Sequence, residues 1–234
     1  MLDSPDSVAR AVAAAMQDVV ADVMARRGRC AIALSGGATP RALYRELAAN
    51  HRSTIRWEHV DVFWGDERFV PPLDPQSNYG MAKAALLDHV PCRSANVHAI
   101  PTDLETPEAA ADAYASILRA YFGDGMPRFD LLLLGIGADG HTASLFPHSP
   151  ALEINDAPVA ATRAPDNGGA RITLTLPVLL AAHTTFVLAT GANKAPAIAR
   201  ALAPETPIAD CPAAALRQSA GTVTWWLDTA SSTH

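Results

Sequence analysis

The chain has 234 residues, of which 49% are hydrophobic and 18% charged, with short apolar runs separated by Gly and Pro. This composition excludes a disordered chain, and the length suits one undivided α/β domain, so we expect residues 1–234 to form a single domain. The formal net charge of -6 argues against nucleic acid as a partner, because binding to phosphate backbones requires a basic face.

The N-terminal 28 residues form an amphipathic helical pattern with acidic residues throughout, which is typical of neither a signal peptide nor a transit peptide. No apolar run approaches the roughly 20 residues of a membrane span, so we expect no membrane partner and a cytoplasmic site of action. Cys30, Cys92 and Cys211 are far apart and include no Cys-x-x-Cys pair. We interpret them as ordinary thiols rather than zinc ligands or a redox pair.

Strand-like and helix-like segments alternate in the first part of the chain. In order, they are a helix at 5–27, a strand at 30–34, a helix at 41–50, a strand at 60–64, a helix at 78–89, a strand at 97–100, a helix at 107–122 and a strand at 131–134. This alternation predicts a mostly parallel sheet with helices on both faces, and the uninterrupted apolar run at 131–134 fits a central strand.

The later part of the chain is richer in strands. Candidate strands lie at 158–161, 172–176, 185–190 and 222–227, with helical stretches near 178–182 and 194–203. These strands either complete the main sheet or add a small antiparallel edge. Residues 164–169 contain the Pro, Asp, Asn and Gly that are typical of a hairpin loop.

In open parallel sheets, ligands bind beyond the carboxyl ends of the strands, so the loops that directly follow strands are the candidate site. The first such loop is Ser35-Gly36-Gly37-Ala38-Thr39-Pro40. Its glycines let the backbone approach an anion, its hydroxyls donate, and the next helix points its N-terminal dipole at the ligand. The nucleotide-type ending Gly-Lys-Ser/Thr is absent, which favours the phosphate of a sugar over ATP. The structural alternative is a tight turn capped by Ser or Thr.

The second loop is Trp64-Gly65-Asp66-Glu67-Arg68, followed at some distance by Ser77-Asn78-Tyr79. Three adjacent charges after an apolar strand cannot all be paired in a core, so we expect a solvated or ligand-facing position. Arg68 offers a rigid fork of donors for a phosphate or an oxyanion. A surface charge cluster is the alternative interpretation.

The third loop spans residues 135–147 and contains Gly-x-Gly-x-x-Gly after a strand. A dinucleotide fold would require a long helix there, and Pro147 and Pro150 prevent one. His141 supplies an imidazole two residues from the carboxylate of Asp139, which is a pattern for general-base chemistry and is also found in purely structural roles. Two such residues without a third do not make a metal site, so we expect neither a metal nor another cofactor.

Taken together, residues 34–40, 64–68 with 77–79, and 135–147 resemble the signature segments of the 6-phosphogluconolactonases. The resemblance implies a Rossmann-like α/β fold and hydrolysis of 6-phospho-D-glucono-1,5-lactone to 6-phospho-D-gluconate in the pentose phosphate pathway. Arg171 and Lys194 are similar to basic positions that hold the sugar phosphate in this superfamily. Glucosamine-6-phosphate deaminases share the fold but carry Glu where this chain has Phe146, which favours the lactonase.

The resemblance implies that His141 is the general base, while Asp139 either holds its tautomer or binds a sugar hydroxyl. Arg68 serves either the phosphate or the oxyanion. The expected substrate- and phosphate-binding residues are Ser35, Gly36, Gly37, Thr39, Asp66, Arg68, Gly137, Arg171 and Lys194.

Two other functions stay open at this point. Residues 33–37 nearly match the nucleophile elbow of serine hydrolases, with Ser35 as the nucleophile, although Ala33 replaces the usual Gly and only a helix precedes the strand. A non-catalytic sugar-phosphate sensor is the other alternative, but a binder has no need of the pair Asp139 and His141. We expect a monomer or a small homo-oligomer with a small sugar phosphate as its partner.

Overall fold

The computed structural model describes residues 2–165 and 168–232. Its centre is a five-stranded sheet in the order β2-β1-β4-β7-β8, in which all neighbouring strands run parallel. The strands are β1 (Cys30–Leu34), β2 (Val60–Trp64), β4 (Leu131–Gly135), β7 (Thr184–Ala189) and β8 (Thr222–Leu227). Every residue of β1 and β2 and the first four of β4 are buried, which confirms the predicted central strand.

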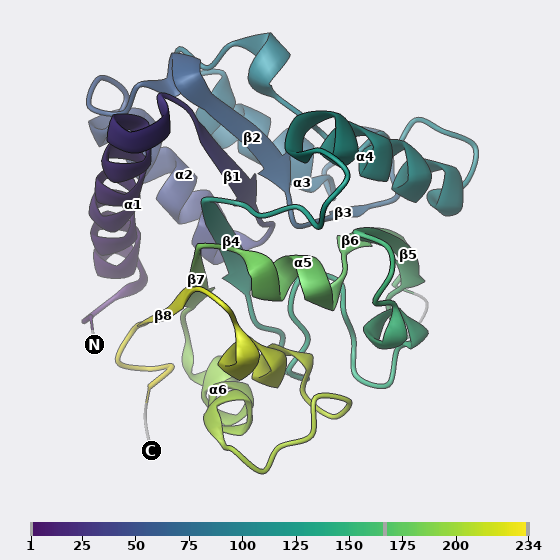
Figure 1. The fold of residues 1–234 in the computed structure, drawn as a ribbon. Coiled ribbons are helices and arrows are strands. Elements are labelled where there is room, and N and C mark those ends of the chain that lie inside the picture. The colour runs from purple at the N-terminus through teal and green to yellow at the C-terminus, as the bar shows by residue number, and fades with distance from the viewer. Residues whose placement is uncertain (1, 166–167, 233–234) are drawn as a thin grey trace.

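Helices cover both faces of this sheet, with α1 and α2 on one side and α4 and α5 on the other (Figure 1). The α-helices are α1 (Pro5–Arg27), α2 (Ala38–Asn50), α3 (Asn78–Ala82), α4 (Pro107–Phe122), α5 (Leu176–Ala181) and α6 (Ala195–Leu202). Short 3-10 turns lie at Trp57–His59, Ser94–Asn96, Pro150–Glu153, Ala192–Lys194 and Pro212–Gln218. The described helices include none with the length and apolar character needed to cross a membrane.

The boundaries of α1 follow from local chemistry. The hydroxyl of Ser4 accepts the N–H of Ser7 at the N-terminus, and Gly28 adopts a left-handed φ of 73° at the C-terminus. Val8, Val12 and Met16 recur at helical spacing and are buried against the sheet. The helix therefore ends where the sequence pattern predicts.

A second, three-stranded antiparallel sheet lies beside the main one, in the order β3-β6-β5. Its strands are β3 (Asp66–Arg68), β5 (Val159–Arg163) and β6 (Ala170–Leu174). This sheet confirms the small antiparallel edge that the sequence left open. The loop between β5 and β6 is a hairpin in which Ala164 N–H donates to Gly169 O, and residues 166–167 of this loop lie outside the described residues.

The structure differs from the elements predicted from the sequence in three places. The segment 97–100 forms a single bridge between Val97 and Val62 rather than a strand. The helix at 78–89 changes after Ala82 into a π-helical turn, Lys83–Leu87. Leu176, predicted as the end of a strand, is the first residue of α5, because Pro177 in its first turn favours a helix start there.

The order of the strands decides where a ligand can bind. The chain steps from β1 to β2 in one direction across the sheet, and from β4 through β7 to β8 in the other. The loops after β1 and β4 therefore diverge, which opens a crevice at the carboxyl ends of these two neighbouring strands. The Gly-rich loops after residues 34 and 135 flank this crevice.

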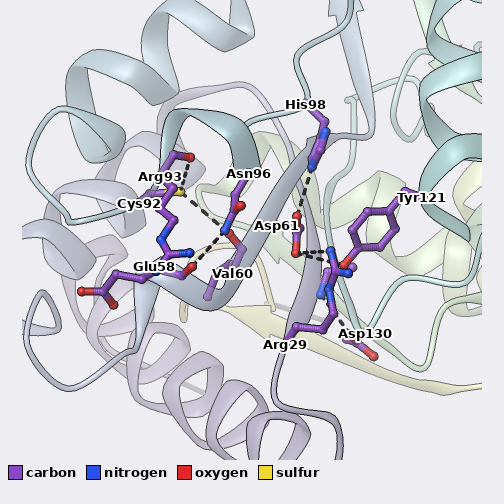
Figure 2. A network of polar contacts seen from close by, with 11 residues as sticks. Arg29, Glu58, Val60, Asp61, Cys92, Arg93, Asn96, His98, Tyr121 and Asp130 are labelled. Atoms are coloured by element: carbon purple, nitrogen blue, oxygen red, sulfur yellow. Dashed lines mark hydrogen bonds and ion pairs between the residues drawn. The ribbon is translucent and has the colours of Figure 1, made fainter.

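The opposite end of the sheet contains a network of charge pairs (Figure 2). Asp61, at the start of β2, accepts hydrogen bonds from Arg29 (2.9 Å), His98 (3.1 Å) and Tyr121 (3.0 Å). Asp130, just before β4, accepts the N–H of Ala31 at 2.9 Å and pairs with Arg27. These carboxylates join the beginnings of β1, β2 and β4, far from the crevice.

Candidate active site

The loop after β1 leaves several donors free for a ligand. Tyr44 of α2 fixes the backbone of Ser35, because its hydroxyl accepts the Ser35 N–H at 3.0 Å and donates to the Ser35 carbonyl at 2.7 Å. Gly37 precedes α2 with a φ of 105°, and no side chain caps this helix. The alternative of a turn capped by Ser or Thr is therefore wrong, and the first N–H groups of α2 stay available for an anion.

The Ser35 hydroxyl is an unusual feature of this loop. It is buried, and it has no hydrogen-bond partner among the described residues. Buried hydroxyls are nearly always bonded in folded proteins, so an unpaired one that lines a cavity indicates a ligand position. Because no base contacts Ser35 Oγ, the geometry does not activate it as a nucleophile.

The three charges after β2 are arranged differently from the expectation. Asp66 and Glu67 are both buried. Asp66 lines the cavity and so takes the ligand-facing position, whereas Glu67 is neither solvated nor at the cavity wall, so the prediction is wrong for Glu67. The Glu67 carboxylate accepts the N–H groups of Arg68 (2.8 Å), Asn78 (2.7 Å) and Tyr79 (2.7 Å) and the hydroxyl of Ser77 (3.1 Å). Burial raises the pKa of Glu67, and the three backbone N–H groups oppose that rise.

Asn78 is a site residue for which the sequence analysis predicted no role. Its side chain is buried, donates to Asp66 O at 3.0 Å and lines the cavity described below. A Cβ atom at Gly36 would overlap the Asn78 side chain, so Gly36 is needed for this close approach. Its neighbour Ser77 caps α3, and this Ser-Asn motif was the available signal.

Asp66 faces the cavity from β3. Ser144 donates its hydroxyl to Asp66 Oδ2 at 2.6 Å and thereby fixes the carboxylate. Arg68, on the same strand, donates to the Gln76 carbonyl at 2.5 Å and also lines the cavity. The loop after β2 therefore supplies one carboxylate and one guanidinium to the site.

Arg68 on β3 is paired directly with Arg171 on β6. Two like charges opposite one another in an antiparallel pair repel each other. Burial, together with the positive charge of Arg68, lowers the pKa of Arg171. A bound dianion would relieve this repulsion, so the pair is suited to a phosphate.

The loop after β4 carries a histidine–aspartate pair. Asp139 Oδ1 lies 2.6 Å from His141 Nδ1 and accepts the His141 backbone N–H at 3.1 Å. Burial raises the pKa of Asp139, but the charge of His141 and the hydrogen bonds from His141 outweigh it, so this pKa lies below its usual value. An ionised Asp139 only accepts, so in the neutral imidazole Nδ1 carries the proton and Nε2 holds the lone pair.

The imidazole has two further neighbours. A Cβ atom at Gly137 would overlap both His141 Nδ1 and Asp139 Oδ1, so the pair packs directly against the Gly137 backbone. The ring of buried Phe146 lies 4.8 Å from the imidazole, centroid to centroid. These contacts restrict the direction in which the imidazole points.

Lys194 reaches the crevice from the loop after β7. The turn before it is anchored by Asp228, whose two carboxylate oxygens accept the Gly191 N–H at 3.0 and 3.1 Å. Thr39 Oγ1 lies 2.8 Å from Thr190 Oγ1, which connects this loop to the start of α2. The residues of the first and last loops thus approach each other across the crevice.

These loops enclose a cavity of about 280 Å³ at the carboxyl ends of the strands. Eight expected site residues line it, namely Ser35, Gly36, Gly37, Asp66, Arg68, Gly137, His141 and Lys194. The other three expected residues stand behind this lining, with Asp139 against His141, Arg171 opposite Arg68 and Thr39 against Thr190. In the part of the chain that the structure describes, no group of three or more His, Cys, Asp or Glu residues is placed to hold a metal ion.

The chain is similar to known proteins over nearly its whole length. The family profile described as glucosamine-6-phosphate isomerases/6-phosphogluconolactonase matches residues 3–225. A 6-phosphogluconolactonase of Synechocystis is 42% identical over 212 residues, which cover 89% of this chain and 86% of that protein. One from Streptomyces coelicolor is 39% identical over 238 residues, covering 97% and 90%. The structure of the Trypanosoma cruzi 6-phosphogluconolactonase superposes with a TM-score of 0.88 at 30% identity, covering 98% of this chain and 93% of that one.

Proposed function

Because the chain belongs to the family of glucosamine-6-phosphate isomerases and 6-phosphogluconolactonases, we propose that it hydrolyses 6-phospho-D-glucono-1,5-lactone to 6-phospho-D-gluconate, with His141 as the general base. The observation that carries the mechanism is the Asp139–His141 pair at the wall of the cavity. Its geometry leaves Nε2 of His141 as a free base in a site rich in cationic donors. This is the lactonase step of the pentose phosphate pathway.

The reaction follows from the position of that nitrogen. Nε2 of His141 accepts a proton from a water molecule while the water oxygen attacks the C1 carbonyl carbon of the lactone. The oxyanion that forms then collapses, the bond between C1 and the ring oxygen breaks, and the imidazolium returns its proton to that oxygen. The ionised Asp139 stabilises the imidazolium between these steps. Water is consumed, and no covalent intermediate forms on the chain.

The phosphate would bind beside the two arginines that are paired across β3 and β6. Arg68 and Arg171 supply positive charge, and the loop from Ser35 to Thr39, with the start of α2, adds hydroxyl and N–H donors. Lys194 closes the other side of the cavity. Holding this remote group fixes C1 relative to His141, which lowers the entropic part of the barrier.

Two observations bear on the alternatives. Phe146 packs against His141, so the position occupied by a Glu in the deaminases is apolar here and supplies no second carboxylate for sugar ring opening besides Asp139. Ser35 lacks a hydrogen-bonded base among the described residues, which argues against a serine nucleophile.

We also propose that residues 1–234 act in the cytoplasm as one domain, in a monomer or small homo-oligomer. One apolar cluster that runs from Val8 to Leu216 supports the single domain.

The test is hydrolysis of freshly prepared 6-phosphogluconolactone, followed above its spontaneous rate. His141→Ala should lower kcat by about 10²- to 10⁴-fold, because general-base catalysis contributes that much. Ser35→Ala should mainly raise KM. The matched control is His59→Ala, since His59 is exposed and directly precedes β2, at the opposite end of the sheet from the cavity.

Three results would contradict the proposal in different ways. A wild-type protein without activity above background would exclude the lactonase. An active His141→Ala variant would exclude the mechanism. Loss of turnover in Ser35→Ala with substrate binding retained would favour the serine nucleophile.

A further inference from the structure

The imidazole of His141 is aimed by the backbone turn from Gly137 to His141. Gly137 N–H donates to the His141 carbonyl at 2.8 Å, and Gly140 N–H donates to the Gly137 carbonyl at 3.0 Å. Gly140 adopts a φ of 94°, a conformation that side chains strongly disfavour. The direction of the imidazole therefore depends on how this turn is held from outside.

Cys211 contacts the turn from its buried side. The carbonyl of Gly140 accepts the Ala213 N–H at 3.0 Å and lies 3.8 Å from Cys211 Sγ. A Cβ atom at Gly140 would lie 2.6 Å from Cys211 Sγ and 3.2 Å from Cys211 Cα. The sulfur thus fills the space beside the residue that immediately precedes His141.

The segment that carries Cys211 also holds the far end of the same loop. His148 N–H donates to the Ala209 carbonyl at 3.0 Å, and His148 Nε2 lies 3.2 Å from Asp210 Oδ1. His148 has a φ of 58°, and Ala143 between the two attachments has a φ of 48°. Such left-handed conformations in residues other than Gly persist only where the surroundings impose them.

The environment of Cys211 favours packing over thiol chemistry. The residue is fully buried in a small apolar cluster with Ile136, Ala197 and Ile198. Burial also raises the pKa of its thiol, which disfavours the nucleophilic thiolate. What the side chain offers is volume in contact with the Gly140 backbone.

We propose that Cys211 is a positioning residue for the lactonase reaction, which sets the direction of the His141 imidazole by fixing the backbone of Gly140 from the buried side. This inference rests on the proposed function, because it assigns Cys211 to the same base. A change in the volume of residue 211 moves the turn, and the base then loses its alignment with the water and C1.

The first experiment compares variants of different volume at this position. Cys211→Ser keeps the size and a donor toward Gly140 O, so its kcat should stay within about threefold of wild type. Cys211→Leu presses on the turn, and a displacement of the base of about 1 Å should lower kcat by about tenfold to 100-fold, with KM changed less than about threefold. All rates refer to folded protein.

Cys30 provides the matched control for this series. It is likewise a fully buried cysteine, but it begins β1, at the opposite end of the sheet from the cavity. Cys30→Leu should lower the melting temperature while kcat of the folded protein stays at the wild-type value. If Cys211→Leu behaves like Cys30→Leu, Cys211 only fills the core and the proposal is wrong.

A second experiment needs no catalysis. NMR titration of His141 should give a changed pKa or ring chemical shift in Cys211→Leu and an unchanged one in Cys30→Leu.

Gly140→Ala should lower the melting temperature less in a Cys211→Ala background than in wild type. The contact with the sulfur is gone in that background, while the backbone strain at residue 140 is the same in both. Equal losses would overturn the inference.

The two experiments separate the two proposals. Wild-type protein that binds the substrate without hydrolysing it would refute the lactonase, while the NMR and melting results would still decide whether Cys211 positions His141. An active wild type with unchanged kcat in Cys211→Leu would refute only the positioning role.

Discussion

At the scale of single residues, the site depends on two glycines that make room for side chains. Gly36 leaves space for Asn78, and Gly137 leaves space for His141 and Asp139. A pattern of glycines after a strand indicates an anion-binding loop, and the sequence supports that interpretation. It does not indicate which distant side chain each glycine admits, because Asn78 reaches Gly36 only through the fold.

Gly137→Ala should therefore abolish most of the activity while the chain stays folded. The added methyl group would displace the imidazole from Asp139 Oδ1, and loss of the oriented base should lower kcat by about 10²-fold or more. The measurement is kcat together with the melting temperature. The matched control is Gly125→Ala, where nothing lies within 4 Å of the added atom. Near-normal turnover in Gly137→Ala would show that the packing of the pair against Gly137 is unimportant.

At the scale of elements, the long helices and the buried strands could be predicted from the sequence, because their apolar periodicity is local. Strand β3 could not be predicted in this way, because its residues Asp66, Glu67 and Arg68 are all charged and show no apolar pattern. The four donors that satisfy Glu67 come from Arg68 itself and from residues 77–79, and their convergence is a tertiary property. The expectation of a solvated or ligand-facing position failed for Glu67 for this reason.

Glu67→Gln tests whether this buried carboxylate shapes the site. The amide of Gln would turn a donor toward N–H groups that need an acceptor, which should cost about 1–3 kcal/mol of folding free energy. Since Asn78 and Arg68 are held by these bonds, KM for the lactone should rise several-fold more than kcat falls. Urea unfolding and steady-state kinetics measure the two effects, with exposed Glu105→Gln as the control. Unchanged KM with lowered stability would limit Glu67 to a structural role.

At the scale of the whole molecule, the two ends of the main sheet carry different tasks. The carboxyl ends of the strands hold the unpaired Ser35 hydroxyl and two arginines paired across neighbouring strands, which are costly without a ligand, together with the base. The other end holds saturated ion pairs around Asp61 and Asp130 (Figure 2). The sequence predicted the first task from its loops. It did not predict the second, because Asp61 meets Arg29, His98 and Tyr121 only when β1, β2 and α4 are assembled.

This division predicts that Asp61→Asn lowers stability without lowering kcat. Burial raises the pKa of Asp61, but the hydrogen bonds from His98, Arg29 and Tyr121 outweigh it, so the folded-state pKa lies below the unfolded value of about 3.9. The unfolded chain then binds more protons than the folded chain as the pH falls, so the contribution of Asp61 is fully present above about pH 4 and is lost below the folded-state pKa. Urea unfolding should therefore separate wild type from Asp61→Asn by about 1–3 kcal/mol at pH 7, and the gap should narrow as the pH falls below about 4. Exposed Asp124→Asn should show no gap at either pH, and a loss of kcat in Asp61→Asn would mean that the two ends of the sheet are coupled.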